Sequence, residues 1–241
     1  SMNDTSLLIS GYDYIRKVPG FFDGEFVVQD QSSCLAVKAA GINEGDLVVD
    51  VCAAPGGKTM YAAMLTGSEG HVISRDLIDK KTELIEENIE RLGLSNVTVQ
   101  VHDAREFDEE LTGKADVVIA DLPCSGLGIM GRKNDIKYHV SMESVKELAQ
   151  LQREILDTVC RYVKPGGTLV YSTCTIDSIE NDENAVWFAD THDFSLCGID
   201  DVVPEHGGER GFVTLHQGID ECDGFFISKF RADSNNQIGQ E

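Results

Sequence analysis

Two cysteines in this sequence stand in short motifs that could carry out covalent chemistry. They are Cys124, in Asp-Leu-Pro-Cys-Ser-Gly, and Cys174, in Ser-Thr-Cys-Thr. A thiolate that adds to carbon 6 of a pyrimidine lets carbon 5 attack an electrophilic methyl group; a base then removes the carbon-5 proton and the thiolate leaves. Such a thiol needs a lowered pKa, for which Lys58 and Lys137 are candidate cations. The residues alone do not indicate which cysteine attacks.

The spacing of the cysteines gives no sign of a metal site. The seven cysteines are irregularly spaced, and none stands in a CxxC pair or in a Cys/His cluster with zinc spacing. We therefore expect no metal and reduced thiols, as in a cytosolic protein.

A glycine-rich turn at residues 50–59 follows the first predicted strand and could hold a nucleoside. It reads Asp-Val-Cys-Ala-Ala-Pro-Gly-Gly-Lys-Thr. A phosphate-binding loop needs glycine at position 52, where this chain has Cys52, and the dinucleotide pattern G-x-G-x-x-G is also absent. These departures argue against an NTPase and favour a nucleoside bound without a pyrophosphate.

Carboxylates follow the next two predicted strands. Asp76 ends the second strand, about where a doubly wound fold places the acid that accepts from both ribose hydroxyls. Asp103 follows the third strand, where it could meet an adenine amino group. Either acid alone is more simply explained as a helix N-cap or a solvated charge, but their succession favours a nucleoside site.

Strands and helices alternate along the chain, which predicts a mostly parallel, doubly wound α/β sheet. We expect strands at 47–52, 71–75, 97–101, 115–120, 168–172, 211–216 and 225–230, and helices at 31–40, 58–66, 79–92, 142–163 and 180–190. The last two strands should form an antiparallel edge hairpin. Ligands bind outside the carboxyl ends of such strands, where all the polar motifs fall.

Composition and charge restrict the kinds of molecule that this protein can bind. The 241 residues are 41% hydrophobic and 26% charged, which is typical of globular domains. The chain has no run long enough to span a membrane and no signal peptide, so we expect a cytoplasmic protein without a membrane partner. The net charge of −22 argues against bulk attraction to a polyanion. A nucleic-acid partner would need local contacts or a further basic module.

Together these motifs resemble those of the RNA 5-methylcytosine methyltransferases of the NOL/NOP/Sun family. Among bacterial members, the chain is most similar to the catalytic domain of the 16S ribosomal RNA enzymes. The resemblance covers about residues 20–230, and it rests on segments 28–33, 50–59, 103–105, 121–126, 132–138, 172–175 and 223–229.

The resemblance implies the class I S-adenosylmethionine methyltransferase fold, which is Rossmann-like, with a seven-stranded, mostly parallel sheet and an antiparallel last strand. The catalytic domain would span 31–231, after a lead-in segment at 1–30 and before a disordered tail at 232–241. In full-length relatives a helical NusB-like RNA-binding domain precedes the catalytic domain. It is absent from this sequence, which we therefore expect to be an excised catalytic domain.

The resemblance also implies a role for each motif residue. Cys174 would attack the cytosine, Cys124 would assist breakdown of the adduct, Asp121 would bond the base edge, and Lys58 would line the pocket. S-adenosylmethionine would contact Cys52, Ala53, Ala54, Pro55, Gly56, Gly57, Lys58, Asp76, Asp103, Ala104 and Asp121. RNA would contact Arg105, Arg132, Lys133, Lys137 and Tyr138.

We therefore expect an S-adenosylmethionine-dependent enzyme that methylates carbon 5 of a cytosine in 16S ribosomal RNA. Two residues depart from the family pattern, since Asn134 and Tyr138 stand where members often have Pro and Trp; Tyr138 can still stack on a base. The alternatives are a tRNA cytosine methyltransferase, a ribosome-assembly binding module that has lost catalysis, and a small-molecule methyltransferase. The last would have no use for two cysteines at strand ends.

Overall fold

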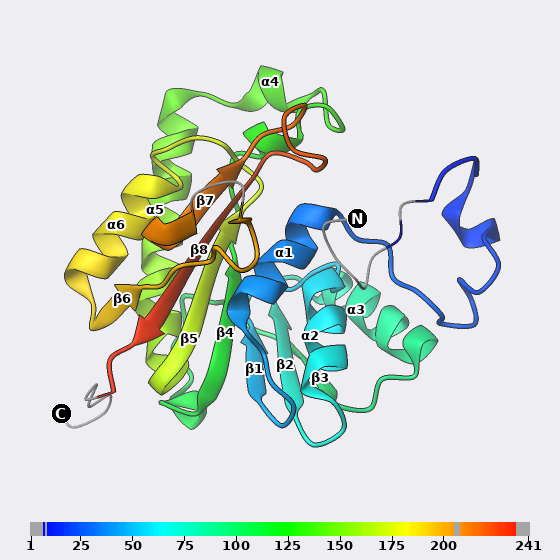
Figure 1. Ribbon diagram of the computed structural model, residues 1–241, viewed down its shortest axis with the longest axis horizontal. Coiled ribbons are helices and arrows are strands. Elements are labelled where there is room, and N and C mark those ends of the chain that lie inside the picture. Colours follow the sequence, from blue (N-terminus) through cyan, green and yellow to red (C-terminus); the bar gives the residue numbers. More distant parts are fainter. Residues whose placement is uncertain (1–6, 8, 205–207, 235–241) are drawn as a thin grey trace.

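A mixed sheet forms the centre of the protein (Figure 1). The computed structural model describes residue 7, residues 9–204 and residues 208–234. The strands are β1 (Leu47–Asp50), β2 (His71–Asp76), β3 (Val97–Val101), β4 (Ala115–Asp121), β5 (Val163–Thr173), β6 (Phe194–Leu196), β7 (Phe212–Leu215) and β8 (Phe225–Ala232). Their order is β3-β2-β1-β4-β5-β8-β6, and β7 also pairs with β8.

The predicted α/β class and mostly parallel sheet are confirmed. Strands β1 to β5 pair in parallel, and β8 runs antiparallel to β5. The sheet has eight strands in the described residues, one more than predicted, because the three-residue strand β6 extends it.

The predicted antiparallel hairpin at the edge of the sheet is confirmed. Strands β7 and β8 pair antiparallel, and β8 lies between β5 on one side and β6 and β7 on the other. Consecutive residues Phe226 and Ile227 are each 0% exposed, so both faces of β8 are buried.

Helices cover both faces of the sheet (Figure 1). They are α1 (Gln31–Ala40), α2 (Gly57–Thr66), α3 (Asp79–Leu92), α4 (Ile136–His139), α5 (Met142–Val159) and α6 (Asp182–Thr191). Alternate strand residues face opposite layers: Val48 packs in a cluster with α1 and α2, and its neighbour Val49 in one with α5 and α6. Two helices end as predicted, at Gly41 and Gly93, both in the left-handed conformation.

The helix predicted at 142–163 is shorter than expected. Helix α5 ends at Val159, a 3₁₀ turn follows at Cys160–Tyr162, and β5 begins at Val163. Val163 is fully buried and pairs with Ala115 of β4, so the chain joins the sheet before the Pro-Gly-Gly sequence begins. Most of the predicted tail, residues 235–241, lies outside the described residues.

Candidate active site

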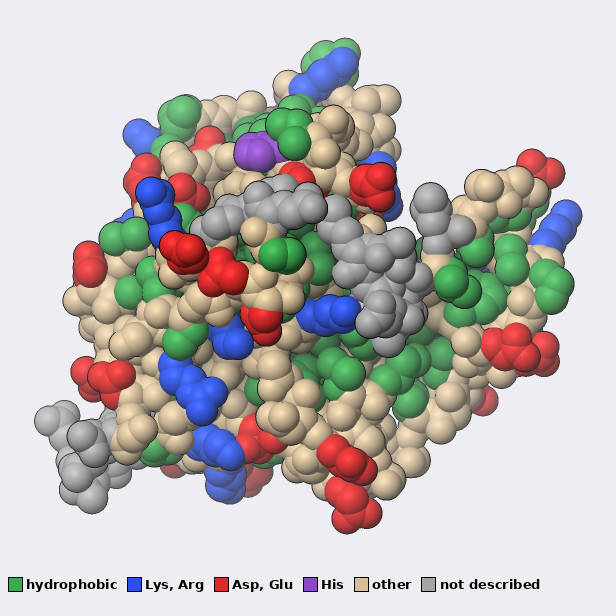
Figure 2. Space-filling model, in the orientation of Figure 1, with side chains coloured by type: hydrophobic (Ala, Val, Ile, Leu, Met, Phe, Trp, Pro, Cys, Tyr) green, Lys and Arg blue, Asp and Glu red, His purple; other side chains and the backbone are tan. Residues whose placement is uncertain are grey.

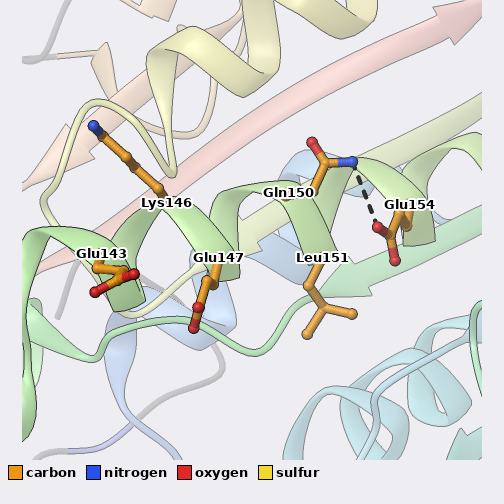
Figure 3. Close-up of a pocket in the computed structure, with 6 residues that line it drawn as sticks. All are labelled: Glu143, Lys146, Glu147, Gln150, Leu151 and Glu154. Atoms are coloured by element: carbon orange, nitrogen blue, oxygen red, sulfur yellow. Dashed lines mark hydrogen bonds between the residues drawn. The ribbon is translucent and has the colours of Figure 1, made fainter.

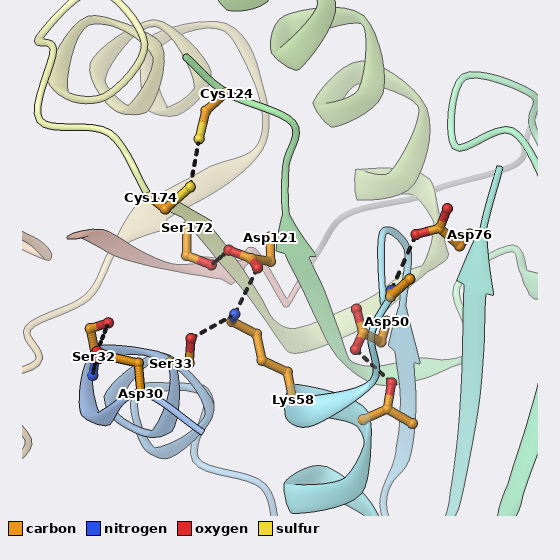
Figure 4. A network of polar contacts seen from close by, with 12 residues as sticks. Asp30, Ser32, Ser33, Asp50, Lys58, Asp76, Asp121, Cys124, Ser172 and Cys174 are labelled. Carbon is orange, nitrogen blue, oxygen red and sulfur yellow. Dashed lines mark hydrogen bonds and ion pairs between the residues drawn. The ribbon is translucent and has the colours of Figure 1, made fainter. Parts of the chain in front are cut away.

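The polar motifs meet at one edge of the sheet (Figure 4). Strands β1, β4 and β5 are parallel neighbours, and Asp121 at the end of β4 lies opposite Ser172 of β5. The loop after β4 carries Cys124 and the loop after β5 carries Cys174. The structure therefore brings the two thiols together, from positions 50 residues apart in the chain.

The two thiols share a hydrogen bond. Their Sγ atoms lie 3.3 Å apart, and both side chains are partly buried. The bond from Cys124 lowers the pKa of the Cys174 thiol, against the effect of burial and of the Asp121 charge and with help from the Lys58 ammonium. The same bond, together with burial, raises the pKa of Cys124 well above its ordinary value. Cys174 is thus the thiol that ionises first.

A mostly buried ion pair lies next to the thiols (Figure 4). Lys58, in the first turn of α2, places its Nζ 2.6 Å from Oδ2 of Asp121, and the two side chains are 10% and 29% exposed. The same ammonium donates to the Ser33 hydroxyl at 3.2 Å, and Ser172 donates to Oδ1 of Asp121 at 2.8 Å. Both carboxylate oxygens of Asp121 are therefore held in place.

The glycine-rich turn brings backbone N–H groups and two carboxylates to the same edge of the sheet. Helix α2 begins at Gly57 without a side-chain cap, so its first backbone N–H groups are available to a ligand. Asp76 accepts from the backbone N–H of Ala54 at 3.2 Å, which fixes the carboxylate beside the turn. Asp50 is fully buried, and its Oδ1 has no hydrogen-bond partner within the described chain. Burial raises the pKa of Asp50 to about 7.

Cys52 also lies in this turn. Burial, followed by the nearby charges of Asp50, Asp76 and Asp121, raises the pKa of its thiol far above the ordinary value. Ala53 and Ala104, predicted to contact the cofactor, are both buried.

The predicted adenine-binding and RNA-binding residues at 103–105 are bonded to each other. Arg105 donates from its backbone N–H and from its guanidinium Nη2 to Asp103, at 3.0 and 2.6 Å. The side-chain bond from Arg105 lowers the pKa of Asp103. The Arg105 guanidinium is consequently already partnered within the chain.

Three of the remaining predicted RNA contacts have exposed side chains. Lys133, Lys137 and Tyr138 are exposed, and the Lys137 ammonium lies 5.0 Å from the Tyr138 ring centre. On the face shown in Figure 2, several basic side chains follow one another at the lower left, and acidic side chains lie among and beside them.

Arg132 is held by two carboxylates that the sequence analysis did not identify. Its guanidinium lies 2.6 Å from Asp30 and 3.0 Å from Asp223. Asp30 also accepts from the Ser32 backbone N–H at the start of α1. Such an N-cap is recognisable in a sequence, but its second bond to Arg132, 102 residues away, leaves no local signal.

A separate hollow lies along α5 (Figure 3). Its lining residues are Glu143, Lys146, Glu147, Gln150, Leu151 and Glu154, and none of them belongs to a predicted motif. Three glutamates suit an RNA phosphate poorly. Within the described residues there is no cluster of side chains that could hold a metal, and no helix is long and apolar enough to cross a membrane.

Comparison with known proteins identifies relatives over most of the chain. A family model described as 16S rRNA methyltransferase RsmB/F matches residues 38–231. The probable ribosomal RNA small subunit methyltransferase B of Bacillus subtilis is 42% identical over 88% of this chain and 48% of the relative. Ribosomal RNA small subunit methyltransferase F of Escherichia coli O7:K1 is 35% identical over 86% of this chain and 45% of the relative. The chain thus spans about half the length of these curated relatives.

Solved structures agree with this relationship. The structure of PH0851 matches with a TM-score of 0.85 and 31% identity, over 91% of this chain and 50% of that one. NSun6 from Pyrococcus horikoshii with SFG matches with a TM-score of 0.78 and 29% identity, over 91% and 56% of the two chains. The predicted Rossmann-like methyltransferase fold is thereby confirmed, and the match of the family model shows that this chain belongs to the 16S rRNA methyltransferase RsmB/F family.

Proposed function

We propose that this chain methylates carbon 5 of a cytosine in 16S ribosomal RNA through a covalent adduct with Cys174. The observation that carries the proposal is the pair of thiols 3.3 Å apart, of which Cys174 has the lowered pKa. A covalent route to carbon 5 needs one thiolate to attack and one further group to take a proton. The names of the curated relatives support small-subunit ribosomal RNA as the substrate and, with it, a cytoplasmic location.

S-adenosylmethionine is the proposed methyl donor, and it supplies the methyl group when bound. The backbone at 53–57 and the Asp76 carboxylate would hold it, since a carboxylate accepts from two adjacent ribose hydroxyls. The unpartnered Oδ1 of Asp50 offers a further acceptor in the same turn. The relative solved with SFG, an analogue of this donor, supports the proposal.

The chain's own residues would move the protons. The Cys174 thiolate attacks carbon 6, and Asp121, which Lys58 holds in place through an ion pair, accepts from the cytosine amino group. Once Cys174 is bonded to carbon, the S–H of Cys124 loses its acceptor and can release its proton to solvent. The Cys124 thiolate can then take the carbon-5 proton, the double bond between carbons 5 and 6 re-forms, and the bond to Cys174 breaks.

RNA containing 5-fluorocytosine tests the attacking thiol, because fluorine at carbon 5 blocks the elimination. The wild-type chain should form a covalent complex with such RNA, and Cys174→Ala should form none. With ordinary RNA, Cys124→Ala should accumulate the adduct. If Cys174→Ala is trapped and Cys124→Ala is not, the two roles are reversed.

The RNA class needs a separate experiment. Fragments covering the small-subunit transcript should be trapped, and a tRNA pool tested in parallel should not. Trapping of tRNA alone would replace ribosomal RNA as the substrate. A chain that binds ribosomal RNA but transfers no methyl group would be a binding module instead.

For the domain organisation, we propose that residues 31–231 form the catalytic domain, with 1–30 as a lead-in and 232–241 as a tail. The family model, which matches residues 38–231, supports these limits. Lys133, Lys137 and Tyr138 are the proposed RNA contacts, since their exposed side chains lie in the segment that follows the Cys124 loop.

A further inference from the structure

A buried polar network joins the two loops that carry the thiols. Its centre is Glu180, which lies between β5 and α6 and is 0% exposed. Its carboxylate accepts from the backbone N–H of Ser125 at 2.9 Å, from the Ser125 hydroxyl, and from the Gln152 amide at 3.0 Å. No ion pair to Glu180 is present in the part of the chain described. A buried carboxylate without a cation depends on such donors, because its unpaired charge would cost several kcal/mol.

The direction of each hydrogen bond in this network follows from counting protons. Ser125 has one hydroxyl proton, which it donates to Oε2 of Glu180. The hydroxyl oxygens of Ser125 and Thr175 lie 2.9 Å apart, so Thr175 is the donor between them. Glu180 therefore holds the residue after Cys124 directly and the residue after Cys174 through one hydroxyl.

The next residue in the chain, Asn181, holds the Cys174 loop from both sides. Its side chain is fully buried, and its Oδ1 accepts from the Thr173 hydroxyl at 2.6 Å. Its Nδ2 donates to the carbonyl of Thr175 at 3.0 Å. Thr173 and Thr175 flank Cys174, so one amide bonds the side chain before the thiol and the backbone after it.

The sheet alone does not hold the two thiols together. The β4–β5 ladder ends at the pair Asp121 and Ser172, and both cysteines lie beyond it. Past that point two backbone bonds connect the segments, from the N–H of Leu122 to the carbonyl of Ser172 and from the N–H of Gly128 to the carbonyl of Cys174, each at 3.0 Å, and neither involves Cys124.

We propose that Glu180 and Asn181 are positioning residues that hold the thiols of Cys124 and Cys174 close enough to act on one base. They act through Ser125, Thr173 and Thr175. The inference rests on the proposed function, because the spacing of the thiols matters for catalysis only if both act on the same cytosine.

Phenylarsine oxide tests the spacing without RNA. Its arsenic forms two As–S bonds and releases water, and the bridged product forms tightly only when both thiols are already close. The purified chain is titrated with this probe, and peptide mass spectrometry identifies the bridged cysteines. Cys124→Ala and Cys174→Ala define the affinity for a single thiol.

The informative variants are Glu180→Gln and Ser125→Ala, with Ser228→Ala as the matched control. A glutamine side chain offers one acceptor oxygen in place of two, and alanine at 125 removes the link to Thr175. The control removes another buried hydroxyl, which donates to the Tyr171 backbone carbonyl and has no bond to Glu180 or Asn181. We expect the two network variants to bind the arsenical about tenfold more weakly than wild type, because preorganisation is lost, and the control to bind normally.

Several outcomes would overturn the inference. Wild-type affinity for the arsenical in both network variants would do so, and so would an equal loss in Ser228→Ala, which would indicate general loosening. If Glu180→Gln does not fold, Ser125→Ala decides alone. In RNA assays the network variants should lower kcat and leave KM unchanged. Failure of the proposed function is distinct from all of these: the wild-type chain would then bind the arsenical but would not be trapped by 5-fluorocytosine RNA.

Discussion

The hydrogen bond between the two thiols shifts their pKa values in opposite directions. The accepting sulfur gains stabilisation of its ionised form and the donating sulfur loses it, which is why the pKa of Cys174 falls and that of Cys124 rises. The assignment of Cys174 as the attacking thiol in the proposed mechanism depends on this direction.

Removing the donor should therefore raise the pKa of Cys174. In Cys124→Ala we expect the pH midpoint of Cys174 alkylation by iodoacetamide to move upward, so that the rate near neutral pH falls, since the thiolate is the reacting form. Peptide mass spectrometry over about pH 6 to 10 measures the midpoint. Cys124→Ser keeps a hydroxyl donor and should stay close to wild type. An unchanged midpoint in Cys124→Ala would mean that Cys124 does not lower the pKa of Cys174.

The ion pair beside the thiols contributes to stability as well as to the site. Lys58→Met leaves the Asp121 carboxylate with Ser172 alone, and we expect it to lower the free energy of unfolding by about 2 kcal/mol, below the range for a fully buried pair because Asp121 is partly exposed. Denaturant unfolding of Lys58→Met, Asp121→Asn and the double variant measures the coupling. Additive losses, within about 0.5 kcal/mol, would mean that the two side chains do not interact.

At the scale of elements, local sequence patterns predict a helix or strand correctly where the signals for its two ends lie within it or next to it. Helix α3 spans Asp79–Leu92 as predicted, because apolar residues recur at helical spacing and Gly93 ends it in the left-handed conformation. Strand β6, with three residues, is too short to show a period. The interior position of β8 depends on pairing with β5, which is far away in the chain, so no local pattern could indicate it.

The same contrast between local and long-range signals applies to the site. Asp76, Asp121 and Cys174 could be predicted to lie at the ligand-binding edge because each follows a buried strand. The bonds that hold them could not, since their partners come from other elements. Glu180 is an example: it stands among polar residues before α6, and only the fold shows that its side chain is buried beneath the thiols.

A close contact between two loops makes a further prediction at this scale. A Cβ on Gly128 would collide with the carbonyl of Gly224 and come within 2.9 Å of the carbonyl of Cys174. Gly128→Ala should therefore separate the loops and lower stability by about 1–3 kcal/mol, measured by denaturant unfolding. Gly57→Ala is the control, because its Cβ would meet Gln29 at an ordinary 3.5 Å. Equal stability of the two variants would show that the two loops can move apart without a cost in folding free energy.

At the scale of the whole molecule, the charge of the chain opposes its proposed substrate. A net charge of −22 repels RNA at long range, and two of the five predicted RNA contacts, Arg105 and Arg132, are already bonded to carboxylates. Attraction then depends on Lys133 and Lys137, which are exposed and form no ion pair in the described structure. Binding by this chain should be local and weakly dependent on salt.

Salt titration of RNA binding measures this balance. Each phosphate contacted by a cation in a single strand contributes about −0.7 to the slope of log K against log salt, so two lysines predict a slope no steeper than about −1.4. Lys133→Ala with Lys137→Ala should bring the slope to zero or above it, because salt then only screens the repulsion. Arg105→Ala should leave the slope nearly unchanged, since Asp103 already engages that guanidinium. A steep slope that survives the double substitution would place the phosphate contacts on another surface of the protein.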